Sequence, residues 1–245
     1  MFDSLNPSEL IVRYVGDILR EKDRDMYICS LFSPPRVRSA IMALYAFNAE
    51  VTATFSVFDE PTVGYVRLKW WYDALEGVFK GTPAHHPVLT LLEKVVPLGI
   101  NRQVLESLIE AELLKLGDER VLYSSTRWVP LFVHVLDLLG SRSDETERAA
   151  ENAAKAWGEL SKLRNSAKGS SDIRTDYNIV SNYRAKASGI KGDAVPALLP
   201  MVLADIYLER IKRVGYNSKH QLVQRSDPGV LVFFRLWWAV NFCGV

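Results

Sequence analysis

The sequence has few of the features that mark membrane-spanning, nucleic-acid-binding or disulfide-rich proteins. None of its apolar runs reaches the roughly 18 residues that a transmembrane helix needs. Its 30 Lys and Arg nearly match its 29 Asp and Glu, so no basic excess favours binding to nucleic acid. The only cysteines, Cys29 and Cys243, show no metal-ligand spacing, which favours a reducing compartment. We therefore expect a chain that neither spans a membrane nor binds nucleic acid.

The amino-terminal segment also lacks the pattern of a targeting signal. Targeting helices are rich in Arg and poor in acids, whereas acidic residues are frequent here. They are Asp3, Glu9, Asp17, Glu21, Asp23 and Asp25. The run Asn6-Pro7-Ser8-Glu9 instead predicts the start of a helix, with Asn6 as the N-cap and Pro7 at the first helical position.

Strand signals are missing as well, because neither sustained period-two alternation nor hairpin turns nor internal repeats occur. Apolar residues recur instead at the three- and four-residue spacing of helices. Gly140 is expected to end one of these helices, and Asp144 to cap the next. At 245 residues the chain can bury one sizeable core, so we predict an all-α fold and a single domain over residues 1–245. The predicted helices cover about residues 6–19, 25–32, 36–57, 60–79, 87–96, 101–116, 126–139, 144–165, 196–214 and 226–240.

The most informative stretch is residues 41–79, where two helical patterns are separated by Asp59-Glu60-Pro61. The first pattern predicts one inward face, and the second predicts a buried apolar stripe. The inward face comprises Ile41, Leu44, Tyr45, Asn48, Thr52 and Phe55. The stripe comprises Val63, Val66, Trp70, Trp71, Ala74, Leu75 and Val78.

Two short runs in this stretch, LYAFNAE at residues 44–50 and RLKWWYDAL at residues 67–75, resemble the squalene/phytoene synthase family. The likeness is to its branch of short bacterial and mitochondrial synthase-like relatives. Members of the family condense two prenyl diphosphates head to head inside an all-helical barrel. The resemblance covers about residues 24–238. It implies an isoprenoid-synthase-like helical barrel or bundle with a central apolar cavity.

The acids of the family's metal sites are missing from this sequence. In active members, carboxylates four residues apart on one helix face hold the Mg²⁺ that binds the diphosphate leaving group. After Phe47 only Glu50 is acidic, and it precedes the place of the aspartates. The second motif resembles residues 153–179, with Asn165, Lys168 and Gly169 where acids are expected. We therefore predict no cofactor, with Mg²⁺ only if the chain is a transferase after all.

One pair of acids, Asp172 and Asp176, has the spacing of a metal-binding face if its segment is helical. Gly169 and the two serines that follow it predict a turn there instead. Residues 155–191 also carry eight Lys or Arg against three Asp or Glu. Such an excess could receive an anionic headgroup or diphosphate without metal, or it could belong to a solvated loop.

The resemblance implies a pocket lined by residues of both motifs and of the segment RDMYICSLFSPPRVR, residues 24–38. For Tyr27 an ordinary place in the core is the simpler alternative. The substrate-binding candidates are Tyr27, Tyr45, Asn48, Glu50, Trp71, Arg164, Arg174 and Tyr177.

Three other features have ordinary interpretations. His85 and His86 predict a solvated loop pair, because no acid or cysteine completes a metal set with them. His134, three residues before Asp137, predicts a core or rim histidine. The tryptophans of the last helix predict packing against the rest of the fold, because Arg235 alone is too little positive charge for a helix that lies on a bilayer.

Three functions from different classes remain open. The first is a non-catalytic module that binds or assembles other molecules, as the resemblance implies through a mitochondrial relative, an assembly factor of respiratory complex I. Its partner would be a respiratory-complex subunit, and its location cytoplasmic or peripheral at the inner membrane. The second is a prenyl transferase of the squalene or phytoene type. The third is a carrier of a prenyl diphosphate or lipid in the cavity. We predict no Mg²⁺-dependent release of diphosphate from farnesyl or geranylgeranyl diphosphate.

Overall fold

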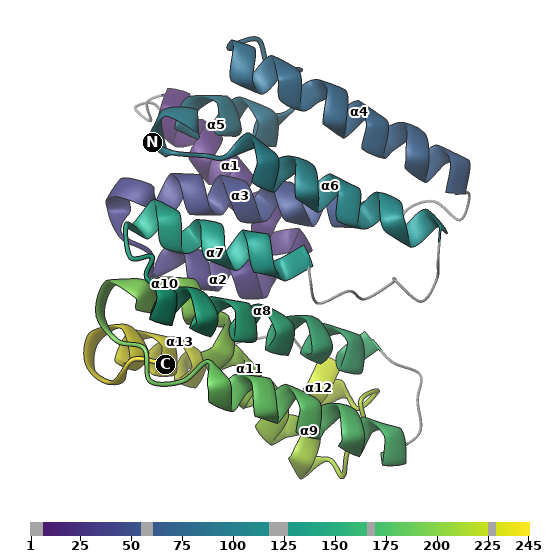
Figure 1. Cartoon of the computed structure of the whole chain (residues 1–245), viewed down its shortest axis with the longest axis vertical. Helices are drawn as coiled ribbons and strands as arrows, with labels where there is room; N and C mark the ends of the chain where they lie inside the picture. Colours follow the sequence, from purple (N-terminus) through teal and green to yellow (C-terminus); the bar gives the residue numbers. More distant parts are fainter. Residues whose placement is uncertain (1–6, 55–60, 118–126, 166–169, 225–228) are drawn as a thin grey trace, which may run out of the picture. The chain divides into compact units, whose positions relative to one another are not determined.

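The computed structural model describes residues 7–54, 61–117, 127–165, 170–224 and 229–245 (Figure 1). Within these ranges every regular element is a helix and none is a strand, which confirms the predicted all-α class. The chain groups into two compact units, residues 1–122 and residues 123–245. The single domain over residues 1–245 stays a prediction.

Proline begins four helices of the first unit, where its missing N–H leaves no hydrogen bond unmade. Asp23 caps the short second helix by accepting a hydrogen bond from the Met26 backbone N–H at 3.1 Å. The predicted cap Asn6 and the predicted break at Asp59-Glu60 lie outside the described residues. The elements are α1 (Pro7–Lys22), α2 (Arg24–Leu31), α3 (Pro35–Ala53), α4 (Pro61–Lys80), α5 (Pro87–Val95), the 3₁₀-helix η1 (Val96–Leu98) and α6 (Arg102–Gly117).

Helix α3 lies at the centre of the first unit, in contact with α1, α2, α5 and α6 (Figure 1). Residues 40–51 are all buried, so the helix is enclosed on every side over three turns. The single inward face predicted from the sequence was therefore too narrow. Alanines at positions 40, 43, 46 and 49 contribute little volume and allow neighbouring helices to approach closely.

Helix α4 buries part of the predicted stripe and leaves most of the rest of it exposed. Leu68, Trp71, Leu75 and Val78 are buried, whereas Val63, Val66 and Trp70 are exposed. The reason is that α4 packs mainly on α5 and α6, with Trp71 also against Phe47 of α3, so it buries a narrow seam. The remaining apolar side chains of α4 therefore form a second row that faces the solvent.

The second unit is built around α8, which packs against α7, α9, α10 and α11 (Figure 1). Helix α7 ends at Gly140 in the left-handed conformation, as predicted. Helix α8 has the predicted bounds, but its cap is Ser143, whose hydroxyl accepts a hydrogen bond from Thr146 N–H. The elements are α7 (Trp128–Leu139), α8 (Asp144–Asn165), α9 (Ser170–Lys186), η4 (Gly192–Ala194), α10 (Val195–Leu198), α11 (Pro200–Arg213), α12 (Gln221–Gln224), α13 (Val230–Trp238) and the π-helix η5 (Ala239–Cys243).

Two segments of this unit differ from prediction. The turn expected around residues 170–177 is the first part of α9, because contact along α8 outweighs the weak helix propensity of Gly and Ser. The helix predicted over residues 196–214 is interrupted at Leu199, since Pro200 has no N–H to continue the hydrogen-bond ladder.

The aromatic face of α13 does not pack as predicted. Trp237 and Trp238 remain 45% and 43% exposed, while Val232 and Leu236 supply its buried contacts. The predicted start at Ser226-Asp227-Pro228 lies outside the described residues. In the described part of the chain, no helix combines the length and the apolar character needed to cross a bilayer.

Candidate functional site

The first cluster of predicted site residues forms around Glu50, near the carboxyl end of α3. Its carboxylate is buried, and its Oε2 atom lies 3.4 Å from the Nζ atom of Lys22, the last residue of α1. This ion pair joins α1 to α3. A buried carboxylate needs such a partner, because an uncompensated charge in an apolar site is costly.

His86 completes this cluster and was not expected to do so. It precedes α5 and caps it, because its Nδ1 accepts a hydrogen bond from Val88 N–H at 3.3 Å. Its ring stands edge-on to Trp71, with the ring centroids 4.8 Å apart. Burial lowers the pKa of His86, and the nearby Glu50 carboxylate opposes that shift only in part. The predicted solvated pair is therefore wrong for His86, although His85 is exposed.

We call Lys22, Glu50, Trp71 and His86 the Glu50 cluster. Four elements meet in it: the end of α1, the end of α3, the middle of α4 and the start of α5. Trp71 also packs against Phe47 of α3, with the ring centroids 5.5 Å apart. The sequence signal for His86 was its position directly before Pro87, which is where a helix cap stands.

Three buried polar side-chain atoms of the first unit have no hydrogen-bond partner among the described residues. They are the hydroxyls of Ser33 and Tyr45 and the indole Nε1 of Trp71. Burial raises the pKa of Tyr45, and the nearby ionisable groups of Cys29 and Asp23 raise it further. Buried polar groups nearly always find a partner, so each of these atoms is a candidate for a hydrogen bond to a ligand atom or a water.

The remaining candidates of this unit are dispersed. Tyr27 is half-buried on α2, and its ring lies beside Gly16 of α1. Asn48 is buried in α3. Tyr45 faces the Cys29 side of α3, two residues from Phe47, which faces Trp71. The structure therefore brings Glu50 and Trp71 together and leaves Tyr27 and Tyr45 on another side of α3.

In the second unit, the predicted arginines lie over tyrosine rings that the sequence had not singled out. The guanidinium carbon of Arg164 is 3.9 Å from the ring centroid of Tyr207, and that of Arg210 is 5.5 Å from the same centroid. A cation over an aromatic face is attracted by the ring quadrupole. Arg164, at the end of α8, is therefore fixed against α11.

Arg174 and Tyr177, both on α9, meet at Tyr216. The Arg174 guanidinium carbon lies 4.8 Å from the Tyr216 ring centroid, and the rings of Tyr177 and Tyr216 are 5.3 Å apart and nearly perpendicular. Tyr216 has a φ of 63°, in the left-handed region that non-glycine residues rarely adopt. Arg174 and Tyr177 thus share one partner, while Arg164 belongs to the separate contact with Tyr207.

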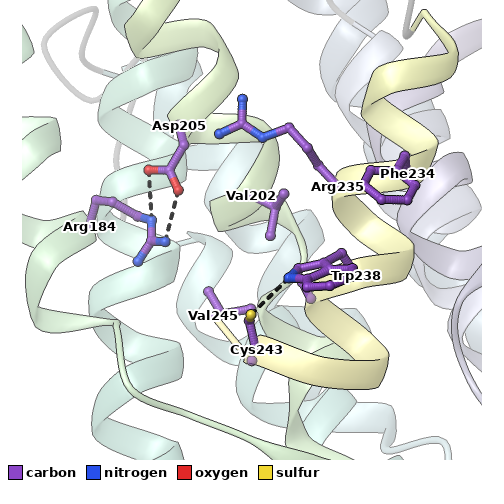
Figure 2. Close-up of a pocket in the computed structure, with 10 residues that line it drawn as sticks. Arg184, Val202, Asp205, Phe234, Arg235, Trp238, Cys243 and Val245 are labelled. Carbon is purple, nitrogen blue, oxygen red and sulfur yellow. Dashed lines mark hydrogen bonds and ion pairs between the residues drawn. The ribbon is translucent and has the colours of Figure 1, made fainter.

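A cleft of about 360 Å³ lies beside α13 (Figure 2) and contains none of the predicted residues. Arg184 and Asp205 form one wall through two hydrogen bonds of 2.9 and 2.8 Å. Trp238 stands on the other side and donates to the Cys243 sulfur at 2.8 Å. A second cleft of about 330 Å³ shares Phe234 and Arg235 with the first.

The described end of α3 does not by itself fit a magnesium site. Its one carboxylate is already paired with the ammonium group of Lys22. Across the part of the chain that the structure describes, no three His, Cys, Asp or Glu side chains gather closely enough to hold a metal ion. On α9, positions 172 and 176 are one helical turn apart, contrary to the predicted turn.

The curated proteins that this chain resembles include assembly factors of complex I. The "NADH dehydrogenase (ubiquinone) complex I, assembly factor 6" of Rattus norvegicus is 25% identical over 87% of this chain and 78% of its own length. The homolog of that factor in Drosophila melanogaster is 25% identical over 92% of this chain and 82% of its own length.

Two solved structures show the same fold. Squalene synthase HpnC from Alicyclobacillus acidocaldarius has a TM-score of 0.64 at 16% identity, over 86% of this chain and 96% of that one. A dehydrosqualene synthase has a TM-score of 0.69 at 12% identity, over 94% of both chains. The helices therefore follow the isoprenoid-synthase fold, as predicted. Residues 19–168, more than half of the chain, match the family model described as "Squalene/phytoene synthase", and the chain belongs to the squalene/phytoene synthase family.

Proposed function

We propose that this chain is a synthase-like module that assists the assembly of respiratory complex I without transferring prenyl groups. The relatives that carry the name of a complex I assembly factor align with most of this chain and with most of their own length. The observation that carries the proposal is the ion pair of Glu50 with Lys22. It occupies the one carboxylate between Phe47 and the end of α3, just before the place where an active relative carries its aspartates.

The electrostatic reason concerns the leaving group. A departing diphosphate carries about three negative charges, which two or three Mg²⁺ ions neutralise in a metal-dependent site. A single carboxylate whose charge is balanced by Lys22 has little affinity left for a divalent ion. The positions that follow on α3 are Val51, Thr52 and Ala53, which carry no charge.

Deletion of the gene in its own host tests the proposal, with the amount of assembled complex I on native gels as the readout. We expect the amount to fall several-fold and to be restored by the wild-type chain. The matched variant Glu50→Gln keeps the side-chain shape and removes the charge, and it should restore complex I as well. Unchanged complex I in the deletion strain would contradict the proposal.

A second candidate is a carrier of a prenyl diphosphate or lipid chain. It is favoured by the buried Tyr45 hydroxyl and Trp71 indole N–H, which have no hydrogen-bond partner among the described residues. Calorimetry with farnesyl diphosphate, with and without Mg²⁺, separates the candidates. A carrier binds equally well in both conditions and loses affinity in Tyr45→Phe, by about tenfold if that hydroxyl meets the ligand.

The transferase alternative keeps one specific observation in its favour. Positions 172 and 176 lie one turn apart on α9, which is the spacing of a metal-binding face. Turnover of farnesyl diphosphate that needs Mg²⁺ and is lost in Asp176→Asn would establish this activity. The absence of turnover in the wild-type chain would leave the assembly and carrier functions.

A further inference from the structure

The face of α13 and the π-helix that follows it is the largest group of exposed apolar side chains in the second unit. Leu231 is 78% exposed and Phe242 is 60% exposed. The complete set is Val230, Leu231, Phe233, Phe234, Trp237, Trp238 and Phe242, which we call the α13 face. Neighbouring members stack on one another, as Trp238 and Phe242 do at a centroid distance of 4.7 Å. A contiguous apolar patch of this kind marks an interaction surface.

The charges around the α13 face have one predominant sign. Helix α13 and the π-helix contain no Asp or Glu, and their one charged residue is Arg235. Helix α13 packs on α11, whose last turn supplies Arg210, Lys212 and Arg213. The sequence of residues 195–245 holds six Lys or Arg against three Asp or Glu, although the whole chain has a net charge of only +1.

Arginines and apolar groups meet in the cleft of about 330 Å³ between α11 and α13. Arg210, Arg213 and Arg235 line it together with Leu231 and Phe234, and the one acid in its lining is Glu209. Glu209 pairs with Arg235 through two contacts of 3.1 Å. The lining therefore retains a positive balance beside exposed apolar side chains, which suits a phosphate group attached to an acyl chain.

We propose that the α13 face docks the chain on the surface of a membrane that contains anionic lipid. Tryptophan and phenylalanine insert at the boundary between headgroups and acyl chains, while the cations of α11 contact lipid phosphates. The cations that α13 lacks in its own sequence thus come from the neighbouring helix.

The length of the segment determines how it lies. Nine residues of α13 and five of the π-helix extend about 21 Å at 1.5 Å per residue, less than the roughly 30 Å of a bilayer core. The segment therefore lies in the plane of the interface. This docking surface stands apart from the function proposed above, because it uses neither the Glu50 cluster nor any assembly partner.

Flotation of the full chain with lipid vesicles tests the docking surface. We expect binding to phosphatidylcholine vesicles that contain phosphatidylglycerol, and at least about tenfold weaker binding to phosphatidylcholine alone. Trp237→Ala/Phe242→Ala should lower the binding to anionic vesicles by at least about tenfold. Arg210→Gln/Arg213→Gln should lower it by about fivefold for each charge removed.

Two variants serve as checks. Tyr65→Ala removes a ring that is 54% exposed on α4 of the other unit, and it should bind vesicles as the wild type does. Leu231→Asn changes the α13 face by one exposed side chain. If the double aromatic variant fails to fold, Leu231→Asn should still weaken vesicle binding.

Several outcomes would overturn the proposal. Absence of vesicle binding, equal binding to neutral vesicles, or full binding by the folded double aromatic variant would each do so. Release of the protein from vesicles by soluble glycerol 3-phosphate would point to a site for a small anion. A wild-type dimer that the double aromatic variant dissociates would assign the α13 face to a second copy of the chain.

Discussion

Helices α3 and α13 are both apolar, yet they have opposite surroundings. Helix α3 is enclosed by four neighbouring helices, and residues 40–51 are all buried. Helix α13 has a more uniformly apolar sequence, but it packs on α11 and the following π-helix and exposes most of its aromatic rings. In these two helices, the number of neighbouring elements, and not the apolar content, therefore decides which side chains are buried. The comparison also separates a helix that stabilises the fold from one whose side chains are available to bind a surface.

The largest expected effect is at the centre of α3. Phe47→Ala removes a fully buried ring that packs on Trp71 and leaves a cavity. We expect the free energy of unfolding to fall by about 3–5 kcal/mol, measured by urea denaturation. A loss no larger than the roughly 0.5 kcal/mol expected for the same substitution on α13 would contradict the difference between the two helices.

The next effect concerns the charge that α3 buries. Lys22→Met leaves the Glu50 carboxylate without its ammonium partner, and we expect a loss of about 1–2 kcal/mol in the free energy of unfolding. The cost stays below that of a fully buried pair because Lys22 is partly exposed to solvent. Adding Glu50→Gln to Lys22→Met should recover most of this loss. If the double variant is no more stable than Lys22→Met, the ion pair is not what accommodates Glu50.

A smaller effect depends on pH. Burial lowers the pKa of His134 in α7 below its ordinary value of 6.5, and the nearby Asp137 carboxylate opposes this only in part. The unfolded chain therefore binds more protons than the folded chain below about pH 6.5, so the free energy of unfolding falls as the pH decreases from there. His86 shifts in the same direction.

His134→Asn should make that acid-side slope shallower, by at most about 1.4 kcal/mol for each pH unit. The measurement is urea denaturation between pH 7.5 and 5.5, with His85→Asn as the matched change at an exposed loop position. A slope identical to that of the wild type would show that His134 contributes nothing to the acid sensitivity.

The smallest effect is expected on α13. Phe234→Ala removes a ring that is largely exposed, and it should change the free energy of unfolding by no more than about 0.5 kcal/mol. Phe47→Ala and Phe234→Ala are the same substitution in the two helices compared. A loss at Phe234 as large as that at Phe47 would show that the α13 face is part of the core.

The sequence predicted the helices better than it predicted their surroundings. The bounds of α8 and the end of α7 at Gly140 followed from local periodicity and from a glycine in the left-handed conformation. The start of α9 could not be predicted, because contact with α8 stabilises a segment of low helix propensity. The buried stripe of α4 was predicted too wide, because a period does not reveal how many helices lie alongside.

In the candidate site, too, the contacts between helices could not be predicted from the sequence. The pairing of Glu50 with Lys22 joins residues from two helices, and sequence spacing carries no signal for it. His86 could have been recognised as a helix cap, but its contact with Trp71 depends on the path of the preceding loop. Tyr207 and Tyr216 were missed because an aromatic residue has the same pattern in a core as under an arginine.

Gly244 lines the cleft of Figure 2, and a single substitution there would change the shape of the cleft. Its φ is 76°, and any β-carbon there would collide with the Ile190 carbonyl oxygen. The backbone of the next residue, Val245, bonds to Gly189 and Ile190 at 2.6 and 2.9 Å. The substitution Gly244→Ala would therefore weaken the hydrogen bonds that hold Val245 to residues 189 and 190. It would change the shape of the cleft without replacing any other side chain that lines it.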